Sequence, residues 1–217
     1  MKNPIDGRQF KKELSLEEKR VIESFKGLPF IQEWERVDLI LTWRKFKSAN
    51  ALFLRVENGA RPDLRKIRKI IEDAGILFNE GSLVESSGNP AFWVCFVANN
   101  QADIELISRL WFEGRSPDNL KAHSELGRMY GYPPTAIQAF NQWEAAGAKY
   151  EEKGKFLLTD YEREHYVSEE LSRFAHFQLS KENWHQELDT VRKWAEEIRL
   201  VDAELYKKIE DGNPMNY

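Results

Sequence analysis

The fold is decided by the stretch from residue 49 to residue 113, in which apolar runs alternate with amphipathic segments. The first run is Ala51-Leu52-Phe53-Leu54-Arg55-Val56, and the last is Ala91-Phe92-Trp93-Val94-Cys95-Phe96-Val97-Ala98. Both are short, apolar and bounded by polar or turn-forming residues, which is typical of buried strands. Residues 76–85 predict another strand, joined to the last run by a hairpin connection at Ser86-Ser87-Gly88-Asn89-Pro90.

Two helices are expected in the same stretch. Residues 63–74 place apolar side chains on one helical face and four Lys or Arg side chains on the opposite face, and residues 102–112 are again amphipathic. The resulting order, strand–helix–strand–strand–helix, suits an α+β sandwich with the helices packed on one face of an antiparallel sheet, and resembles ferredoxin-like units. With a helix from Leu16 to Lys26 that starts at the capping box Ser15–Glu18, we expect residues 1–113 to form one α+β domain.

The second half of the chain predicts a mainly helical domain, residues 114–217. One helix opens at Ser116-Pro117-Asp118 and runs to about Tyr130, and a second capping box at Thr159–Glu162 starts a helix that reaches about Phe177. An apolar stripe follows from Trp184 to Ile209 with spacings of three and four. We expect this last segment either to form a long helical hairpin with residues 161–177 or to mediate a homodimer.

Residues 104–160 carry a pattern of helix, sharp turn and helix. The turn is Gly131-Tyr132-Pro133-Pro134, the following helix spans Thr135 to Ala146, and residues 149–158 could form a short two-stranded turn. This order resembles a winged helix-turn-helix module, in which the helix after the turn enters the major groove of DNA. The resemblance implies a nucleic-acid partner; the alternative is a group of ordinary packing helices.

Charge is distributed unevenly along the chain. The net charge is −4, but residues 36–69 carry ten basic and three acidic side chains, whereas residues 70–217 have a balance of −11. Such asymmetry can mark a face for an anionic partner or a contact between oppositely charged halves. The candidate anion-binding or nucleic-acid-binding residues are Arg44, Lys45, Arg65, Lys66, Arg68 and Lys69.

A second candidate site surrounds the turn at residues 131–134. The two prolines rigidify the chain, and the helix that follows offers free backbone N–H groups at its start, which suit an anion or a carboxylate. His123, Glu125 and Arg128 lie one to two helical turns earlier. Together with Tyr132 they form a candidate pocket of a small-metabolite enzyme.

Several functional classes lack their signatures. No phosphate-loop, dinucleotide-binding or G-x-S-x-G motif is present, and we expect no cofactor. The single cysteine, Cys95, permits neither an intrachain disulfide nor a cysteine zinc cluster. The motif His123-Ser124-Glu125 lacks the cysteine half of a deaminase site. The Glu162–His165 spacing supplies one of the two motifs that a di-iron bundle needs, with Glu169 and His176 able to follow on the same face, so no metal site is expected.

Localisation and function follow from these observations as expectations. The longest apolar run is far short of the roughly 20 residues that span a bilayer, and the N-terminus is polar, so we expect a cytoplasmic protein without membrane contact. The leading hypothesis is a binding or regulatory protein with a basic face for an anionic partner, in particular nucleic acid. The alternatives are a small-metabolite enzyme with a site around His123, Glu125 and the Gly131–Pro134 turn, and a dimerising structural protein.

Overall fold

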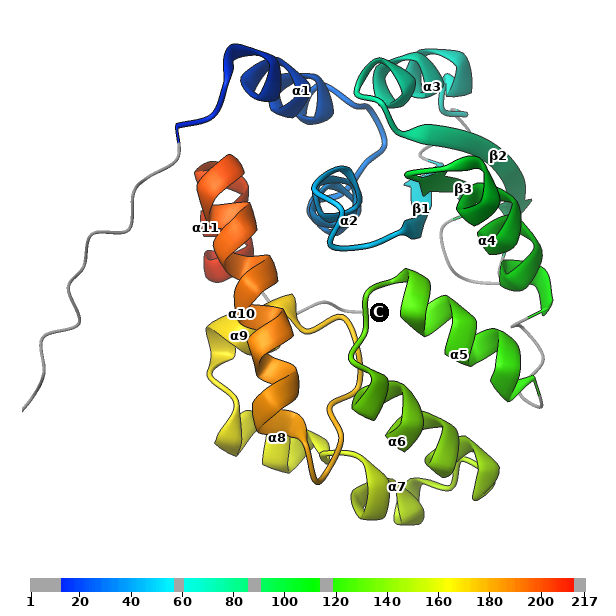
Figure 1. Ribbon diagram of the computed structural model, residues 1–217, viewed down its shortest axis with the longest axis vertical. Coiled ribbons are helices and arrows are strands. Elements are labelled where there is room, and N and C mark those ends of the chain that lie inside the picture. Colours follow the sequence, from blue (N-terminus) through cyan, green and yellow to red (C-terminus); the bar gives the residue numbers. More distant parts are fainter. Residues whose placement is uncertain (1–12, 57–60, 86–90, 114–118, 213–217) are drawn as a thin grey trace, which may run out of the picture.

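The computed structural model describes residues 13–56, 61–85, 91–113 and 119–212 (Figure 1). Its helices are α1 (Leu16–Lys26), α2 (Glu33–Trp43), α3 (Leu64–Asp73), α4 (Gln101–Glu113), α5 (Leu120–Met129), α6 (Pro134–Ala145), α7 (Tyr150–Phe156), α8 (Asp160–Tyr166), α9 (Glu169–Phe174), α10 (Trp184–Val201) and α11 (Ala203–Asp211), and its strands are β1 (Ala49–Arg55), β2 (Leu77–Val84) and β3 (Phe92–Ala98). The fold is therefore α+β and mainly helical. In the described part of the chain, no helix has both the length and the apolar content needed to cross a bilayer.

The three strands form an antiparallel sheet in the order β1-β3-β2. The strands and the helices α3 and α4 follow the chain in the expected order. The expected hairpin connection, residues 86–90, and the expected helix start at residues 116–118 lie outside the described residues. Among the described residues, Asn119 caps α5 by accepting from the backbone N–H of Ala122 at 3.1 Å.

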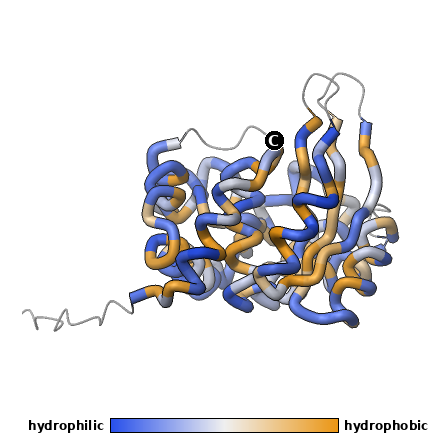
Figure 2. Tube along the Cα trace, turned by 90° about the horizontal axis from the view of Figure 1, so that it is seen from above, coloured by the Kyte–Doolittle hydropathy of each residue, from blue (hydrophilic) through white to orange (hydrophobic). Residues whose placement is uncertain are grey.

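Helices cover both faces of the sheet, so the expectation that they pack on one face is wrong. Leu52 and Leu54 of β1 belong to a core cluster with Ile67 and Ile71 of α3. Ala49 and Ala51, on the opposite face of the same strand, belong to a second cluster with Ile104 and Ile107 of α4. The physical reason is visible in the sequence, since β1 and β3 are apolar at nearly every position rather than at alternate ones (Figure 2).

Helix α2 lies at the centre of the molecule. Leu39, Ile40 and Leu41 are fully buried, with exposed fractions of 0%, and a helix that is apolar on several sides is surrounded by other elements. The apolar residues of this segment are consecutive rather than on one helical face, so its sequence fits either a helix or a strand. The same core cluster includes Leu188, Ile198 and Leu205 of the C-terminal helices, so it combines residues from both sides of residue 114.

Residues 149–158 do not form the expected two-stranded turn. Tyr150–Phe156 is helix α7, with Glu151 and Glu152 in its first turn and Lys153 and Lys155 in its last turn. This charge order complements the helix dipole and favours the helix. Leu157 makes an isolated antiparallel bridge to Ser180 instead.

The expected helix from Thr159 to Phe177 is divided in two. The capping box at Thr159 and Glu162 is formed, but α8 ends at Tyr166 because Val167 is extended and Ser168 caps the new helix α9. The last segment is divided at Asp202, whose carboxylate accepts from the backbone N–H of Leu205 at 3.0 Å. Four shorter helices thus take the place of a single long hairpin, and the apolar stripe of α10 and α11 is buried in the core.

Candidate ligand-binding cavity

The basic residues singled out in the sequence are found on two elements. Arg65, Lys66, Arg68 and Lys69 are exposed on α3. Lys69 pairs with Asp73 at 2.8 Å, and the guanidinium of Arg68 lies 5.5 Å from the centre of the Phe78 ring.

Arg44 and Lys45 lie elsewhere, at the end of α2. The Arg44 guanidinium is 2.7 Å from a carboxylate oxygen of Glu18 and 2.5 Å from one of Glu197, and its side chain is 23% exposed. Since both carboxylates belong to the protein itself, Arg44 acts as a link between α1, α2 and α10.

The residues of the candidate pocket are also separated by the structure. His123 and Tyr132 line a cavity of about 1060 Å³. Glu125 and Arg128 are not among its lining residues and form an ion pair with each other. Arg128 instead borders a smaller cavity of about 380 Å³ between α5 and α6.

The turn at residues 131–134 shapes this region. Gly131 has φ +73°, and a Cβ atom there would lie 2.5 Å from the carbonyl oxygen of Phe46, so glycine is required both by its backbone conformation and by the close approach. The start of α6 faces a carboxylate of the protein. Glu187 accepts from the hydroxyl of Thr135 at 2.7 Å and from the backbone N–H of Ser180 at 2.7 Å.

The residues that line the large cavity come mainly from α5 and α6 and from α8, α9 and the segment after α9. Figure 1 shows where these helices lie in the fold. The cavity walls include five aromatic side chains from α2, α6 and the segments that follow α5 and α9: Trp34, Tyr130, Tyr132, Phe140 and Phe177. Its volume matches cavities that hold drug-sized ligands. A largely aromatic wall with a few polar groups is the usual composition of such a site.

A buried ionic cluster, formed by Lys47, Asp38 and His176, adjoins this cavity. Nζ of Lys47 lies 2.5 Å from Oδ1 of Asp38, and Nδ1 of His176 lies 3.0 Å from the same oxygen. The Lys47 side chain is 1% exposed and the His176 side chain 7%. Nζ of Lys47 also lies 4.8 Å from the centre of the Trp194 ring, in a cation–π contact.

Local structure places Lys47 beside Asp38. Lys45 has φ +63°, which reverses the chain at the end of α2. The carbonyl oxygen of Leu41 then accepts from the backbone N–H groups of Phe46 at 2.9 Å and Lys47 at 3.3 Å. This turn directs Lys47 back toward the helix that carries Asp38.

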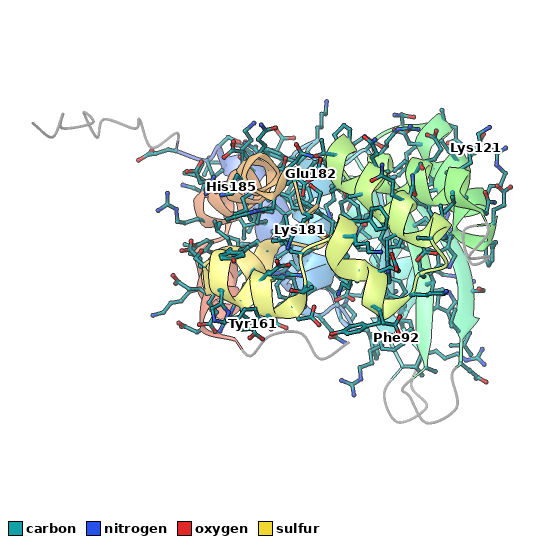
Figure 3. The ribbon with its side chains drawn as sticks, turned by 90° about the horizontal axis from the view of Figure 1, so that it is seen from below. Phe92, Lys121, Tyr161, Lys181, Glu182 and His185 are labelled. Carbon is teal, nitrogen blue, oxygen red and sulfur yellow. The ribbon has the colours of Figure 1, made fainter. Side chains whose placement is uncertain are left out.

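The segment that carries His176 is held by α8. Arg163 donates to the hydroxyl of Ser172 at 2.9 Å, to its carbonyl oxygen at 2.7 Å and to the carbonyl oxygen of Ala175 at 3.2 Å. Lys181, which is further along the chain and is labelled in Figure 3, pairs with Glu162 of α8. The ring of Trp34 packs edge-on against His176 with 4.9 Å between ring centres. These contacts fix the imidazole at the cavity wall.

Electrostatics determine the hydrogen-bonding role of each ring nitrogen. Burial alone would raise the pKa of Asp38, but the adjacent Lys47 and His176 outweigh this effect and hold its pKa well below the usual range. An ionised carboxylate only accepts hydrogen bonds, so Nδ1 of His176 is the donor. In the neutral imidazole, the lone pair is therefore on Nε2, for which no hydrogen-bond partner is found among the described residues.

Tyr130 also borders the cavity. Burial raises the pKa of its hydroxyl, and the Asp38 carboxylate raises it further. Tyr130 therefore keeps its proton at neutral pH and offers the cavity a neutral phenol rather than a phenolate.

Asp38, Lys47 and His176 were not predicted as a site. Lys47 counted only as part of the basic stretch, and His176 only as a candidate metal ligand. The available signal was Asp38, a charged residue inside the apolar segment that forms α2.

Within the described ranges, no three His, Cys, Asp or Glu side chains are arranged to hold a metal ion. A scan against protein-family models and searches of curated proteins and of solved structures found no match to this chain.

Proposed function

We propose that the protein binds a small organic molecule in the large cavity and that His176 exchanges a proton or a hydrogen bond with it. One observation carries the proposal: Asp38 orients a buried imidazole whose Nε2 atom finds no partner in the described part of the protein. The proposal keeps the small-metabolite hypothesis but changes its residues. His123 and Tyr132 become wall residues, and the acid–base group is His176.

The arrangement is suited to general acid–base chemistry. A carboxylate that accepts from Nδ1 fixes the tautomer of a histidine and stabilises the imidazolium that forms when Nε2 takes a proton. Aromatic walls limit competition from water. A buried polar atom without a partner is costly and uncommon in proteins, and a ligand hydroxyl or N–H group would satisfy it.

The test is NMR of the protein labelled with ¹⁵N-histidine, titrated with a library of small aromatic and heteroaromatic fragments. We expect a subset of fragments to shift the Nε2 signal of His176, and His176→Gln to abolish their binding. His185→Gln is the matched control because His185 is exposed on α10. The proposal fails if fragments at millimolar concentration leave the His176 signal unchanged.

A second candidate function remains the binding of an anionic partner, nucleic acid first. It is favoured by the exposure of Arg65, Lys66, Arg68 and Lys69 along one helix. Arg44 is not part of this candidate because its charge is already matched by Glu18 and Glu197.

A salt series of binding to short single- and double-stranded DNA tests this second function. Replacement of the four α3 cations by alanine should reduce the slope of log affinity against log salt. The control replaces four exposed cations of other elements: Arg109, Lys121, Arg192 and Lys193. Absence of binding at low salt, or an equal loss in both variants, would exclude α3 as the binding face.

A further inference from the structure

We infer that the cavity takes a flat, uncharged or cationic nitrogen heterocycle that carries an amino group, and that Asn141 accepts a hydrogen bond from that group. The inference rests on the proposed function, since it names the ligand class of the same cavity. It comes from a polar atom of Asn141 on α6, which lines the same cavity as His176.

Asn141 lies on α6 and lines both the large and the small cavity. Its Nδ2 atom lies 2.6 Å from the hydroxyl oxygen of Ser124, and that hydroxyl donates to the carbonyl oxygen of Leu120 at 2.7 Å. Because the only proton of the Ser124 hydroxyl is used in this way, the oxygen must accept from Asn141. The orientation of the amide is thereby determined, with Oδ1 as the remaining acceptor.

Oδ1 of Asn141 is buried and has no hydrogen-bond partner within the residues that the structure describes. Nε2 of His176, another lining residue of the same cavity, is also buried without a hydrogen-bond partner among the described residues. A ligand that satisfies both acceptors must carry at least two donors. Amino groups and ring N–H groups of nitrogen heterocycles provide such donors in the plane of a ring.

The charges around the cavity disfavour an anion. The guanidinium of Arg163 is used by Ser172 and Ala175, and Arg173 donates to the carbonyl oxygens of Ile209 and Glu210 and to Glu169. The carboxylates of Asp160, Glu164 and Glu169 also line the cavity. Nε of Arg173 has no hydrogen-bond partner among the described residues, but an added negative charge would meet three carboxylates against two guanidinium groups, whereas a neutral or cationic ring would not add to this excess.

The aromatic walls suit a planar ring. Tyr132 has its ring centre 5.6 Å from that of Tyr130 and 5.2 Å from that of Phe177, and Phe140 of α6 also lines the cavity. Aromatic side chains bind the faces of heterocycles regardless of the substituents on their edges. Stacking therefore supplies affinity, while Asn141 and His176 select the hydrogen-bond donors.

The experiment compares ligands that differ only by exchange of an amino group for a methyl group of similar size. Calorimetric titrations use adenine against 6-methylpurine, and 4-aminopyrimidine against 4-methylpyrimidine. We expect each amino compound to bind at least tenfold more tightly than its methyl analogue. Adenosine and its 5′-phosphate extend the series, and the phosphate should bind no more tightly than the nucleoside.

Variants assign the preference to Asn141. Asn141→Leu should reduce the amino-to-methyl ratio to below threefold, and Asn141→Asp, which keeps an acceptor oxygen, should retain the preference. Gln138→Leu is the matched control, because Gln138 is exposed on α6 and lines only the small cavity. Circular dichroism checks that each variant is folded.

The outcomes separate this inference from the proposed function. If fragments shift the His176 signal but the amino and methyl compounds bind equally, the ligand class is wrong and the small-molecule site stands. Tighter binding of the 5′-phosphate than of adenosine would overturn the charge argument. If no compound in either series binds and no fragment shifts His176, both proposals fall.

Discussion

Nδ1 of His176 lies 3.0 Å from Oδ1 of Asp38, although 138 residues separate the two in the sequence. The contact joins α2, at the centre of the core, to the segment after α9 that forms one wall of the cavity. Lys47 meets the same oxygen, so one carboxylate serves a buried cation and a histidine together. The stability of the core and the orientation of the imidazole therefore depend on the same group.

Asp38→Asn should destabilise the protein strongly. The substitution leaves the Lys47 ammonium buried without a counter-ion, and removing one partner of a buried ion pair costs about 3–5 kcal/mol. Lys47→Met should also destabilise, but the double variant should be less destabilised than the sum of the two. Urea denaturation of the four proteins measures the coupling. Additive costs would show that Lys47 and Asp38 do not interact energetically.

An exposed pair provides the comparison for this cycle. Asp189 pairs with Arg192 at 2.6 Å, but the two side chains are 63% and 51% exposed. Exposed pairs contribute about 1 kcal/mol or less. Asp189→Asn should therefore change the urea midpoint only slightly.

Stability should fall with rising pH because of Glu35. Burial above all, with the nearby Asp38 and Glu33 carboxylates, raises the pKa of this carboxyl to about 7, against backbone hydrogen bonds that lower it. A raised pKa in the folded state contributes stability that is fully present below the unfolded pKa near 4.5 and is lost as pH rises through about 7. The shift corresponds to a loss of roughly 3 kcal/mol between these pH values.

Glu35→Gln should remove most of this pH dependence. The variant should be more stable than the wild type at pH 8 and should gain little at pH 5, as measured by urea denaturation between pH 5 and pH 8.5. Glu182→Gln is the control, because Glu182 is exposed and does not contribute to the raised pKa of Glu35. Parallel pH profiles for wild type and Glu35→Gln would contradict the assignment.

Local signals in the sequence predicted local structure well. The Ser15–Glu18 capping box places the start of α1 because both of its hydrogen bonds are made within four residues. The apolar runs predicted β1 and β3, since their side chains are buried on both faces. Burial on both faces of these strands also implies that helices cover both faces of the sheet, which the prediction of helices on one face did not take into account. For residues 149–158 the prediction was a two-stranded turn, but the acidic first turn and the basic last turn of this segment favour helix α7.

The candidate site could not be predicted because its contacts join residues that are distant in the sequence. In the sequence, Lys47 cannot be told apart from an exposed basic residue. It is buried because the turn at Lys45 directs it back toward α2. His176 has no motif around it, since its partner is on α2. His123 and Tyr132 were singled out because they lie near a rigid turn, and that turn does border the cavity. Glu125 and Arg128 are on the same helix as His123 but do not line the cavity.

Arg163→Lys should loosen the segment before His176. An ammonium cannot reproduce the planar fork that bonds Ser172 and Ala175 together, and losing such bonds costs about 1–3 kcal/mol. Amide hydrogen exchange should become faster at residues 175–178, and the His176 signal should broaden. Arg109→Lys, at a side chain that is 66% exposed, should leave both measurements unchanged. Unchanged exchange in Arg163→Lys would show that other contacts hold the segment.

The effect of Gly127→Ala should change sign with the residue at position 137. Gly127 is buried where α5 crosses α6, and an added Cβ would lie 2.9 Å from Cγ1 and 3.1 Å from Cδ1 of Ile137. In the wild type this overpacking should cost about 1–3 kcal/mol. In an Ile137→Ala background the space is free, and the higher helix propensity of alanine should make the same substitution neutral or stabilising by up to about 1 kcal/mol. Both residues line the cavity, so Gly127→Ala in the wild-type background should also weaken fragment binding. Thermal denaturation of the four proteins measures the sign, and an equal cost in both backgrounds would show that the helices separate rather than repack at Ile137.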